Sequence, residues 1–247
     1  MAVHLVLSLG SGILQLERKG THSASLSFLR IRRGREGAPT LQCTETFAHK
    51  EGELQAALDR ALVGVGLAEA RSQAGAKLEV ALGFQHSRVA VMTLAGLRET
   101  EANLSRAVEA WAQTRLNLNP HEHVLRWERL PRGGRYLVSC VRRDGLNHLR
   151  EFTTQRRMQL ASVRPAVLEA LDAVNGPHRK DRLRRDLVWT EGEAPGSTAV
   201  AQVFAFAGGS LQCDWRGSMQ SPDGLLRRLH ASHALEPGEL IRRSWPM

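Results

Sequence analysis

The sequence predicts an α/β protein in which short strands and hairpins alternate with amphipathic helices. Two observations support this fold class. Short runs of β-branched and large apolar residues end at glycine-containing turns, which is typical of strands. Longer segments have apolar residues at intervals of three and four, which is the spacing of amphipathic helices. No stretch approaches the roughly 18 consecutive apolar residues of a membrane-spanning helix. We therefore expect a soluble chain of one large domain or two modest ones.

The first quarter of the chain begins with predicted strands. They cover residues 3–9, 12–18, 25–33 and 41–47. Gly10 and Ser11 separate the first two, which predicts a tight hairpin. A helix is expected over 51–63, where Leu54 and Leu58 belong to an apolar stripe.

The middle of the chain alternates between the two kinds of element. Strands are predicted at 77–84, 87–94, 123–130, 135–141 and 160–163, and helices at 101–117, 144–158 and 165–174. In the helix over 101–117, Leu104, Val108 and Trp111 share one side, and Glu101 lies at the start, where the helix dipole favours an acid. We expect residues 87–158 to form a β-α-β-β-α unit.

A basic connector over 177–185 is the best candidate for a domain boundary. It would separate a first domain, residues 1–176, from a second, residues 186–247. The second domain is predicted to contain strands at 186–190, 199–206 and 211–216, a helix at 222–232, and an irregular tail over 236–247.

Charge and cysteine content limit the possible environments and partners. The formal net charge of +9 suggests a polyanionic partner, but the basic residues are spread along the chain, as on many soluble surfaces. Cys43, Cys140 and Cys213 are far apart and form no C-x-x-C pair, so reduced thiols are expected. The N-terminus has no basic residue before its apolar run, unlike a secretory signal.

The order of these segments resembles a known family. Two predicted hairpins, VHLVLSLGSGILQLER and AVAQVFAFAGGSLQCDWRG, flank the inserted unit, which contains SRVAVMTL, ANLSRAVEAWAQTRL and RYLVSCVRRDGLNHLREF. Over about residues 3–233 this order resembles the actin-like proteins of type IV pilus and type II secretion machines, PilM and the cytoplasmic part of GspL. The resemblance implies an actin-like, ribonuclease-H-like mixed-sheet lobe with an inserted subdomain at about 87–158 and a truncated second lobe.

The same resemblance implies a degenerate nucleotide site. Its glycine-rich turns would include Ser8, Gly10, Ser11, Gly12, Gly208 and Gly209. The family's first hairpin has an Asp just before the Gly, whereas this chain has Ser8, and residues 203–209 contain no acid either. We therefore expect no ATP hydrolysis, no catalytic residue, no metal and no cofactor, unless an acid such as Asp172 or Asp214 reaches the site.

Two other patterns favour structural interpretations. His121 and His123 could face one side of a strand as a metal pair, but no third ligand is evident, so surface histidines are favoured. The five tryptophans are scattered over predicted helices and strands, which indicates core packing rather than a platform for stacked bases.

The expected function is a non-catalytic scaffold or adaptor. The resemblance implies a cytoplasmic protein, peripheral to the inner membrane, that binds a partner of a pilus or secretion assembly. The basic residues of the connector could contact that partner, an anionic membrane or nucleic acid; they are Arg179, Lys180, Arg182, Arg184 and Arg185. The alternative is a basic nucleic-acid-associated protein on a ribonuclease-H-like core.

Overall fold

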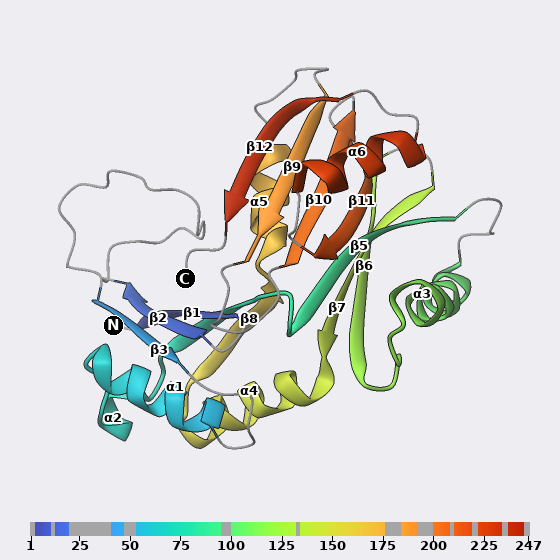
Figure 1. Ribbon diagram of the computed structural model, residues 1–247. Helices are drawn as coiled ribbons and strands as arrows, with labels where there is room; N and C mark the ends of the chain where they lie inside the picture. Colours follow the sequence, from blue (N-terminus) through green and yellow to red (C-terminus); the bar gives the residue numbers. More distant parts are fainter. Residues whose placement is uncertain are drawn as a thin grey trace. The chain divides into compact units, whose positions relative to one another are not determined.

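The computed structural model describes eleven ranges of the chain. They are residues 3–10, 13–19, 41–46, 53–94, 100–131, 134–175, 184–191, 200–207, 210–218, 222–233 and 237–244. The chain divides into two compact units (Figure 1), and each unit combines two separate segments of the sequence. The first consists of residues 1–86 and 144–169, and the second of residues 87–143 and 170–246. Each unit is described in turn.

The first unit contains a five-stranded mixed sheet in the order β3-β2-β1-β4-β8. Its strands are β1 (His4–Leu9), β2 (Ile13–Lys19), β3 (Leu41–Thr46), β4 (Lys77–Leu82) and β8 (Gln159–Pro165). β1 pairs antiparallel with β2, which confirms the first predicted hairpin, and β2 pairs antiparallel with β3. β4 is parallel to both β1 and β8. The strand predicted at 25–33 lies outside the described residues.

Helices cover one face of this sheet. α1 (Glu53–Gly64) and α4 (Arg143–Gln155) both lie below the strands in Figure 1, while α2 (Ala70–Gln73) is a single turn. The buried side of α1 consists of Ala57, Leu58, Ala61 and Leu62, which confirms the apolar stripe predicted for this helix. α4 buries Leu149 and Phe152. The burial of these side chains makes this face apolar.

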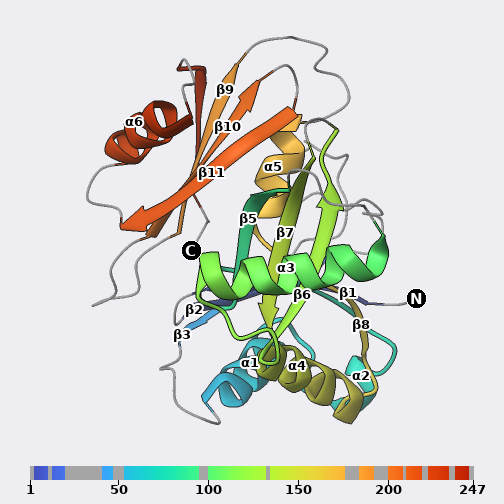
Figure 2. The ribbon, with the colours of Figure 1, turned by 90° about the vertical axis from the view of Figure 1, so that its right-hand side faces the viewer.

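The second unit contains a three-stranded antiparallel sheet in the order β5-β7-β6. Its strands are β5 (Ser87–Thr93), β6 (His123–Arg129) and β7 (Arg135–Arg142), and α3 (Glu101–Leu116) runs across one face (Figure 2). Oγ1 of Thr100 caps α3 by accepting from the amide of Asn103, and Asn117 ends it in the left-handed conformation. Buried Val108 of α3 packs with Tyr136 and Val138 of β7.

A second sheet of this unit has the order β11-β10-β9-β12. Its strands are β9 (Arg185–Thr190), β10 (Val200–Ala207), β11 (Ser210–Ser218) and β12 (Glu239–Ser244), and α6 (Pro222–His233) packs on it. α5 (Val167–Asn175) is the helix in which the chain passes from the first unit into the second. Trp189 is 1% exposed, so the prediction that it anchors a core is confirmed.

The prediction of an irregular tail over residues 236–247 is wrong for Glu239–Ser244, because these residues form β12, which is parallel to β9. The amide of Glu239 donates to the carbonyl of Arg184 (2.9 Å), and the amide of Gly238 donates to Oδ2 of Asp186 (2.8 Å). The same Oδ2 lies 3.0 Å from Nε2 of His230 on α6. Since Arg184 and Asp186 lie more than 50 residues before β12 in the sequence, local pattern could not reveal the strand.

The two mixed sheets share one plan. In the first, strands β1, β2 and β3 form an antiparallel meander, α1 follows, and β4 returns parallel to β1. In the second, β9, β10 and β11 form the meander, α6 follows, and β12 returns parallel to β9. Only the first sheet continues beyond its returning strand, through β8; no described strand holds that position beside β12.

Candidate functional site

The first hairpin, which the sequence singled out for phosphate binding, is held by backbone contacts. The amide of Gly10 donates to the carbonyl of Ile13 (2.9 Å), and the amide of Gly83 donates to the carbonyl of Leu9 (2.8 Å). Nε2 of His86 lies 3.3 Å from the carbonyl oxygen of Gly10. The Gly10 amide therefore closes the turn in this structure, and Ser11 and Gly12 lie outside the described residues.

Ser8 belongs to a row of residues near the carboxyl ends of the parallel strands. It pairs with Gln15 of β2 and Ala81 of β4, and Ala81 pairs with Arg164 of β8. Paired residues in neighbouring strands share a face, so Gln15, Ser8 and Arg164 lie on the same side of the sheet. Ligands of open α/β sheets bind at this edge. β1 contributes a hydroxyl to the row and no carboxylate.

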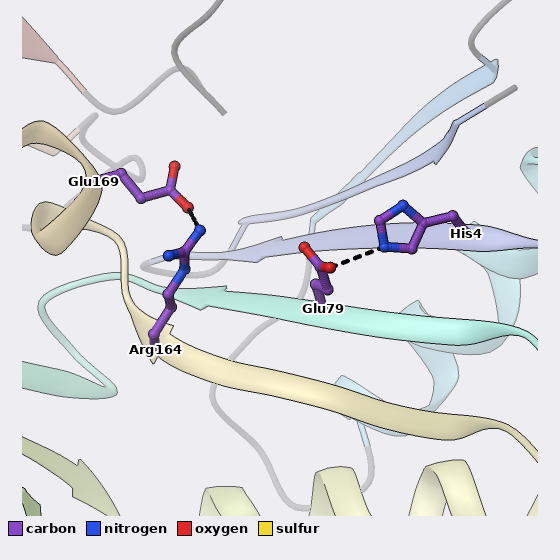
Figure 3. Close-up of polar contacts among 4 residues, drawn as sticks. All are labelled: His4, Glu79, Arg164 and Glu169. Atoms are coloured by element: carbon purple, nitrogen blue, oxygen red, sulfur yellow. Dashed lines mark hydrogen bonds and ion pairs between the residues drawn. The ribbon is translucent and has the colours of Figure 1, made fainter. Parts of the chain in front are cut away.

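Two ion pairs lie on that same side (Figure 3). Nη2 of Arg164 is 2.5 Å from Oε1 of Glu169, in the first turn of α5. Nε2 of His4 is 2.9 Å from Oε1 of Glu79 on β4. Glu79 is 6% exposed, and its other oxygen, Oε2, is buried without a hydrogen-bond partner in the part of the chain that the structure describes. This side of the sheet, which we call the polar sheet face, thus holds carboxylates and cations.

Sequence reasoning missed the polar sheet face. Glu79 was the available signal, because it is the only acid in LEVALGF, a strand that is otherwise apolar. A buried acid in such a strand needs a partner. His4 and Arg164 had no comparable signal, since each lies in a separate strand whose neighbours are set only by the sheet order.

In the second unit, Asp214 binds the outer edge of strand β5. Its Oδ1 accepts from the amide of Val91 (2.6 Å), and its Oδ2 accepts from Nε2 of Gln202 (2.8 Å). The same nitrogen donates to the carbonyl of Val89 (2.5 Å). Side chains of β10 and β11 therefore satisfy backbone groups that an edge strand would otherwise expose. Asp214, one of the two possible catalytic acids, is therefore engaged in hydrogen bonds to Val91 and Gln202. Asp172, the other candidate, is exposed on α5.

The electrostatics of Asp214 predict a pH dependence of stability. Desolvation raises the pKa of Asp214 to about 6 from 3.8, although hydrogen bonds from Val91 and Gln202 and the nearby His233 and Arg216 lower it. The native state thus binds the proton more tightly than the unfolded chain. Lowering the pH from 7 to 5 should stabilise the wild type by about 1 kcal/mol relative to Asp214→Asn. Urea unfolding at both pH values measures this difference, and equal responses of the two proteins would contradict it.

The second predicted phosphate turn, Gly208 and Gly209, lies outside the described residues, although β10 and β11 do form the predicted hairpin. The shared plan of the two sheets makes the β9–β10 connection, rather than β10–β11, the counterpart of the β1–β2 turn. Glu191 is the first residue after β9, just as Gly10 is the first residue after β1, and Glu191 is 7% exposed. The available signal in the sequence was the glycine that follows Glu191, Gly192, because glycine commonly marks a turn.

Arg216 lies within the electrostatic influence of Glu191. Burial lowers the pKa of Arg216 to about 10, and Arg88 adds to this effect, whereas Glu191 and Asp214 oppose it. Glu191 and Asp214 thus both lie near the guanidinium of Arg216.

The basic connector is only partly described. Arg179, Lys180 and Arg182 lie outside the described residues, and Arg184 is exposed. Arg185 does not fit the prediction of an exposed contact, because it is the first residue of β9 and is 6% exposed. Its Nε lies 3.3 Å from Oε2 of Glu239, and its Nη1 donates to the carbonyl of Val174.

Other predicted features can also be placed. His121 is exposed and His123 half-buried, and within the described ranges no three His, Cys, Asp or Glu residues are grouped to hold a metal ion. The three cysteines are free, as expected. None of the helices that the structure describes is long and apolar enough to cross a membrane.

Comparison with known structures identifies the fold. A Bacteroides thetaiotaomicron protein of unknown function with an actin-like ATPase fold matches with a TM-score of 0.56 and 9% identity, over 99% of this chain and 82% of that one. A PilM–PilN type IV pilus biogenesis complex matches with a TM-score of 0.52 and 14% identity, over 94% and 66%. The cytoplasmic domain of EpsL, an inner-membrane component of the Vibrio cholerae type II secretion system, matches at 0.51 and 11%, over 100% and 90%.

No protein-family model and no curated protein sequence matches the chain. At these identities the structural matches establish the fold and leave function open. The α/β class and mixed sheets predicted from the sequence are confirmed, and this protein has the actin-like ATPase fold.

Proposed function

We propose that this protein is a non-catalytic actin-like scaffold of an inner-membrane assembly, of the type IV pilus or type II secretion kind. In this role it binds protein partners from the cytoplasmic side of the membrane. Two of the matched structures support the proposal, since one is a PilM–PilN type IV pilus biogenesis complex and the other belongs to a type II secretion component.

The non-catalytic part of the proposal rests on Ser8, which is one residue before the end of β1. Ser8 stands where the actin-like pattern expects an Asp, and its row continues with Gln15 and Arg164 instead of acids. Metal-assisted phosphoryl transfer requires oxygen ligands for a divalent cation, and carboxylates are the usual ones. A hydroxyl and a guanidinium cannot replace them, because neither supplies the negative charge that holds the cation.

Affinity capture from the native cells tests the proposal. The tagged protein is isolated in parallel with and without nuclease, and with and without a high-salt wash. The proposal expects inner-membrane pilus or secretion proteins that remain bound after nuclease treatment. A recovery dominated by nucleic acid that nuclease or salt removes would reject it, because phosphate contacts weaken steeply with salt.

Restoring one carboxylate should not create an ATPase. Ser8→Asp introduces an acid one residue before the end of β1, but a single added ligand does not assemble a magnesium site. We expect phosphate release from ATP and Mg²⁺ to equal that of a protein-free blank for the wild type, Ser8→Asp and the matched control Ser8→Ala. Release above the blank that requires the added Asp would show that the site retains its other catalytic groups.

A further inference from the structure

The outer edge of β12, the side away from β9, pairs with no strand among the residues that the structure describes. β12 is the terminal strand in the order β11-β10-β9-β12. In the corresponding place of the first sheet, β4 is followed by β8, which pairs with it in parallel. β4 is buried over Leu78–Leu82, whereas Leu240 of β12 is 43% exposed and Ile241 is half-buried. The fold therefore has a strand position here that no described strand of the chain fills.

The backbone register determines which groups face outward. Glu239 pairs with Arg185, and its amide donates to the carbonyl of Arg184 (2.9 Å). In a parallel pair, alternate residues bond to the same neighbour, so Glu239, Ile241 and Arg243 bond toward β9. Leu240, Arg242 and Ser244 consequently direct their amides and carbonyls to the outer side. An incoming strand must therefore bond to residues of this set.

The side chains of β12 divide between the two faces of the sheet. Nη2 of Arg242 is 2.7 Å from Oδ1 of Asp223 on α6, which places Arg242 and Leu240 on the α6 face. Glu239, Ile241 and Arg243 are on the opposite face. Along that face the sequence runs acid, apolar, base, with Ile241 at the centre. The Glu239 side chain is 58% exposed, and Arg243 is exposed as well.

This pattern is complementary to itself. Consider two β12 strands that pair antiparallel about a two-fold axis at Ile241. Leu240 of each strand then lies opposite Arg242 of the other, and these residues can bond to each other because their backbone groups point outward. Ile241 then lies opposite its own counterpart, and Glu239 lies opposite Arg243 on the same face, twice. A register centred on Arg242 would instead place two guanidinium groups opposite each other, which is unfavourable.

We propose that the open edge of β12 binds a second copy of this chain. The two strands pair antiparallel about Ile241 and join the two four-stranded sheets into one continuous sheet. The backbone of Leu240 and Arg242 provides the hydrogen bonds, and the two Glu239–Arg243 pairs set the register. A strand pair buries less surface than the interface of a stable dimer, so the association is reversible and depends on concentration.

Cysteine cross-linking tests the register directly. Residues that face each other in a non-hydrogen-bonded antiparallel pair have Cα atoms about 4.5 Å apart, which a disulfide can span. Ile241→Cys, made in a Cys43→Ser background, should therefore give a disulfide-linked dimer under mild oxidation. Leu240→Cys is the matched control, because a shift of two residues places its Cα about 8 Å from that of its counterpart, beyond the reach of about 7 Å. No dimer with Ile241→Cys, or equal yields from both variants, would overturn the proposal.

A charge exchange tests the pairing without cross-links. Arg243→Glu places acids opposite one another, and Glu239→Lys places bases opposite one another, so each variant alone should dissociate at least tenfold more readily in analytical ultracentrifugation. An equimolar mixture should recover association, because every opposing pair is again attractive. Circular dichroism checks that Glu239→Lys, which also loses its contact with Arg185, remains folded. Unchanged association of the single variants, or a mixture that associates no better than they do, would refute the pairing.

Discussion

Replacing Gly238 with alanine should lower the free energy of unfolding by roughly 2 to 4 kcal/mol, because the added methyl group would collide with backbone. A Cβ at Gly238 would lie 2.5 Å from the carbonyl carbon and 2.7 Å from the carbonyl oxygen of Arg184. The backbone of Arg184 cannot move away without breaking the hydrogen bond from the amide of Glu239 to its carbonyl. Urea denaturation, with hydrogen exchange of the β12 amides, measures the loss.

Gly145→Ala is the matched control for this prediction. Apart from its chain neighbours and the backbone of its own helix, no atom of the described residues lies within 4 Å of the position that a Cβ would take at Gly145, in the first half of α4. Alanine there should raise the free energy of unfolding by about 0.5 to 1 kcal/mol, because it favours the helix. If the two variants change the free energy of unfolding by the same amount in the same direction, the close packing of Gly238 against Arg184 does not explain the effect of Gly238→Ala.

Asp214→Ala is expected to lower the free energy of unfolding by about 2 to 3 kcal/mol. The substitution leaves the amide of Val91 without its acceptor and removes one of the two acceptors of the Gln202 side-chain amide. Gln202 is 1% exposed, so solvent cannot readily replace the lost contact. Chemical denaturation monitored by tryptophan fluorescence measures the change. Faster hydrogen exchange at Val91 would locate it at the edge of β5.

Glu128→Ala provides the comparison for Asp214→Ala, since Glu128 is an exposed acid of the same unit. Its removal should change the free energy of unfolding by no more than about 0.5 kcal/mol. A similar small effect at Asp214, or unaltered exchange at Val91, would mean that the carboxylate does not hold the β5 edge.

Local pattern was a good guide to individual elements. The helix predicted over 101–117 is α3, Glu101–Leu116, because its apolar spacing, its acidic first residue and the capping Thr100 all favour the same conformation. The hairpin predicted around Gly10 is present for a similar reason, with the Gly10 amide closing the turn. In both cases the determining residues are close together in the sequence.

Local pattern failed where a strand depends on a distant partner. Residues 239–244 have exposed charges and little apolar content, so nothing within them distinguishes a strand from a tail. They form β12 because Arg184 accepts from the amide of Glu239 and Asp186 accepts from the amide of Gly238, which holds the segment against β9. The β9–β10 connection corresponds to the β1–β2 turn only through the order of strands in the two sheets, because a hairpin such as β10–β11 can be recognised locally but its place in a sheet cannot.

By itself, the sequence determined the α/β class, most helices and strands, and the absence of an acid at Ser8, since these depend on residue type and on spacing within a few positions. Only the tertiary structure decided which side chains meet. It brought Glu79 to His4, Arg164 to Glu169 and Asp214 to the edge of β5. Two of these contacts join residues far apart in the chain and the third joins a strand to the helix after it, so each needs the folded sheet to set its geometry.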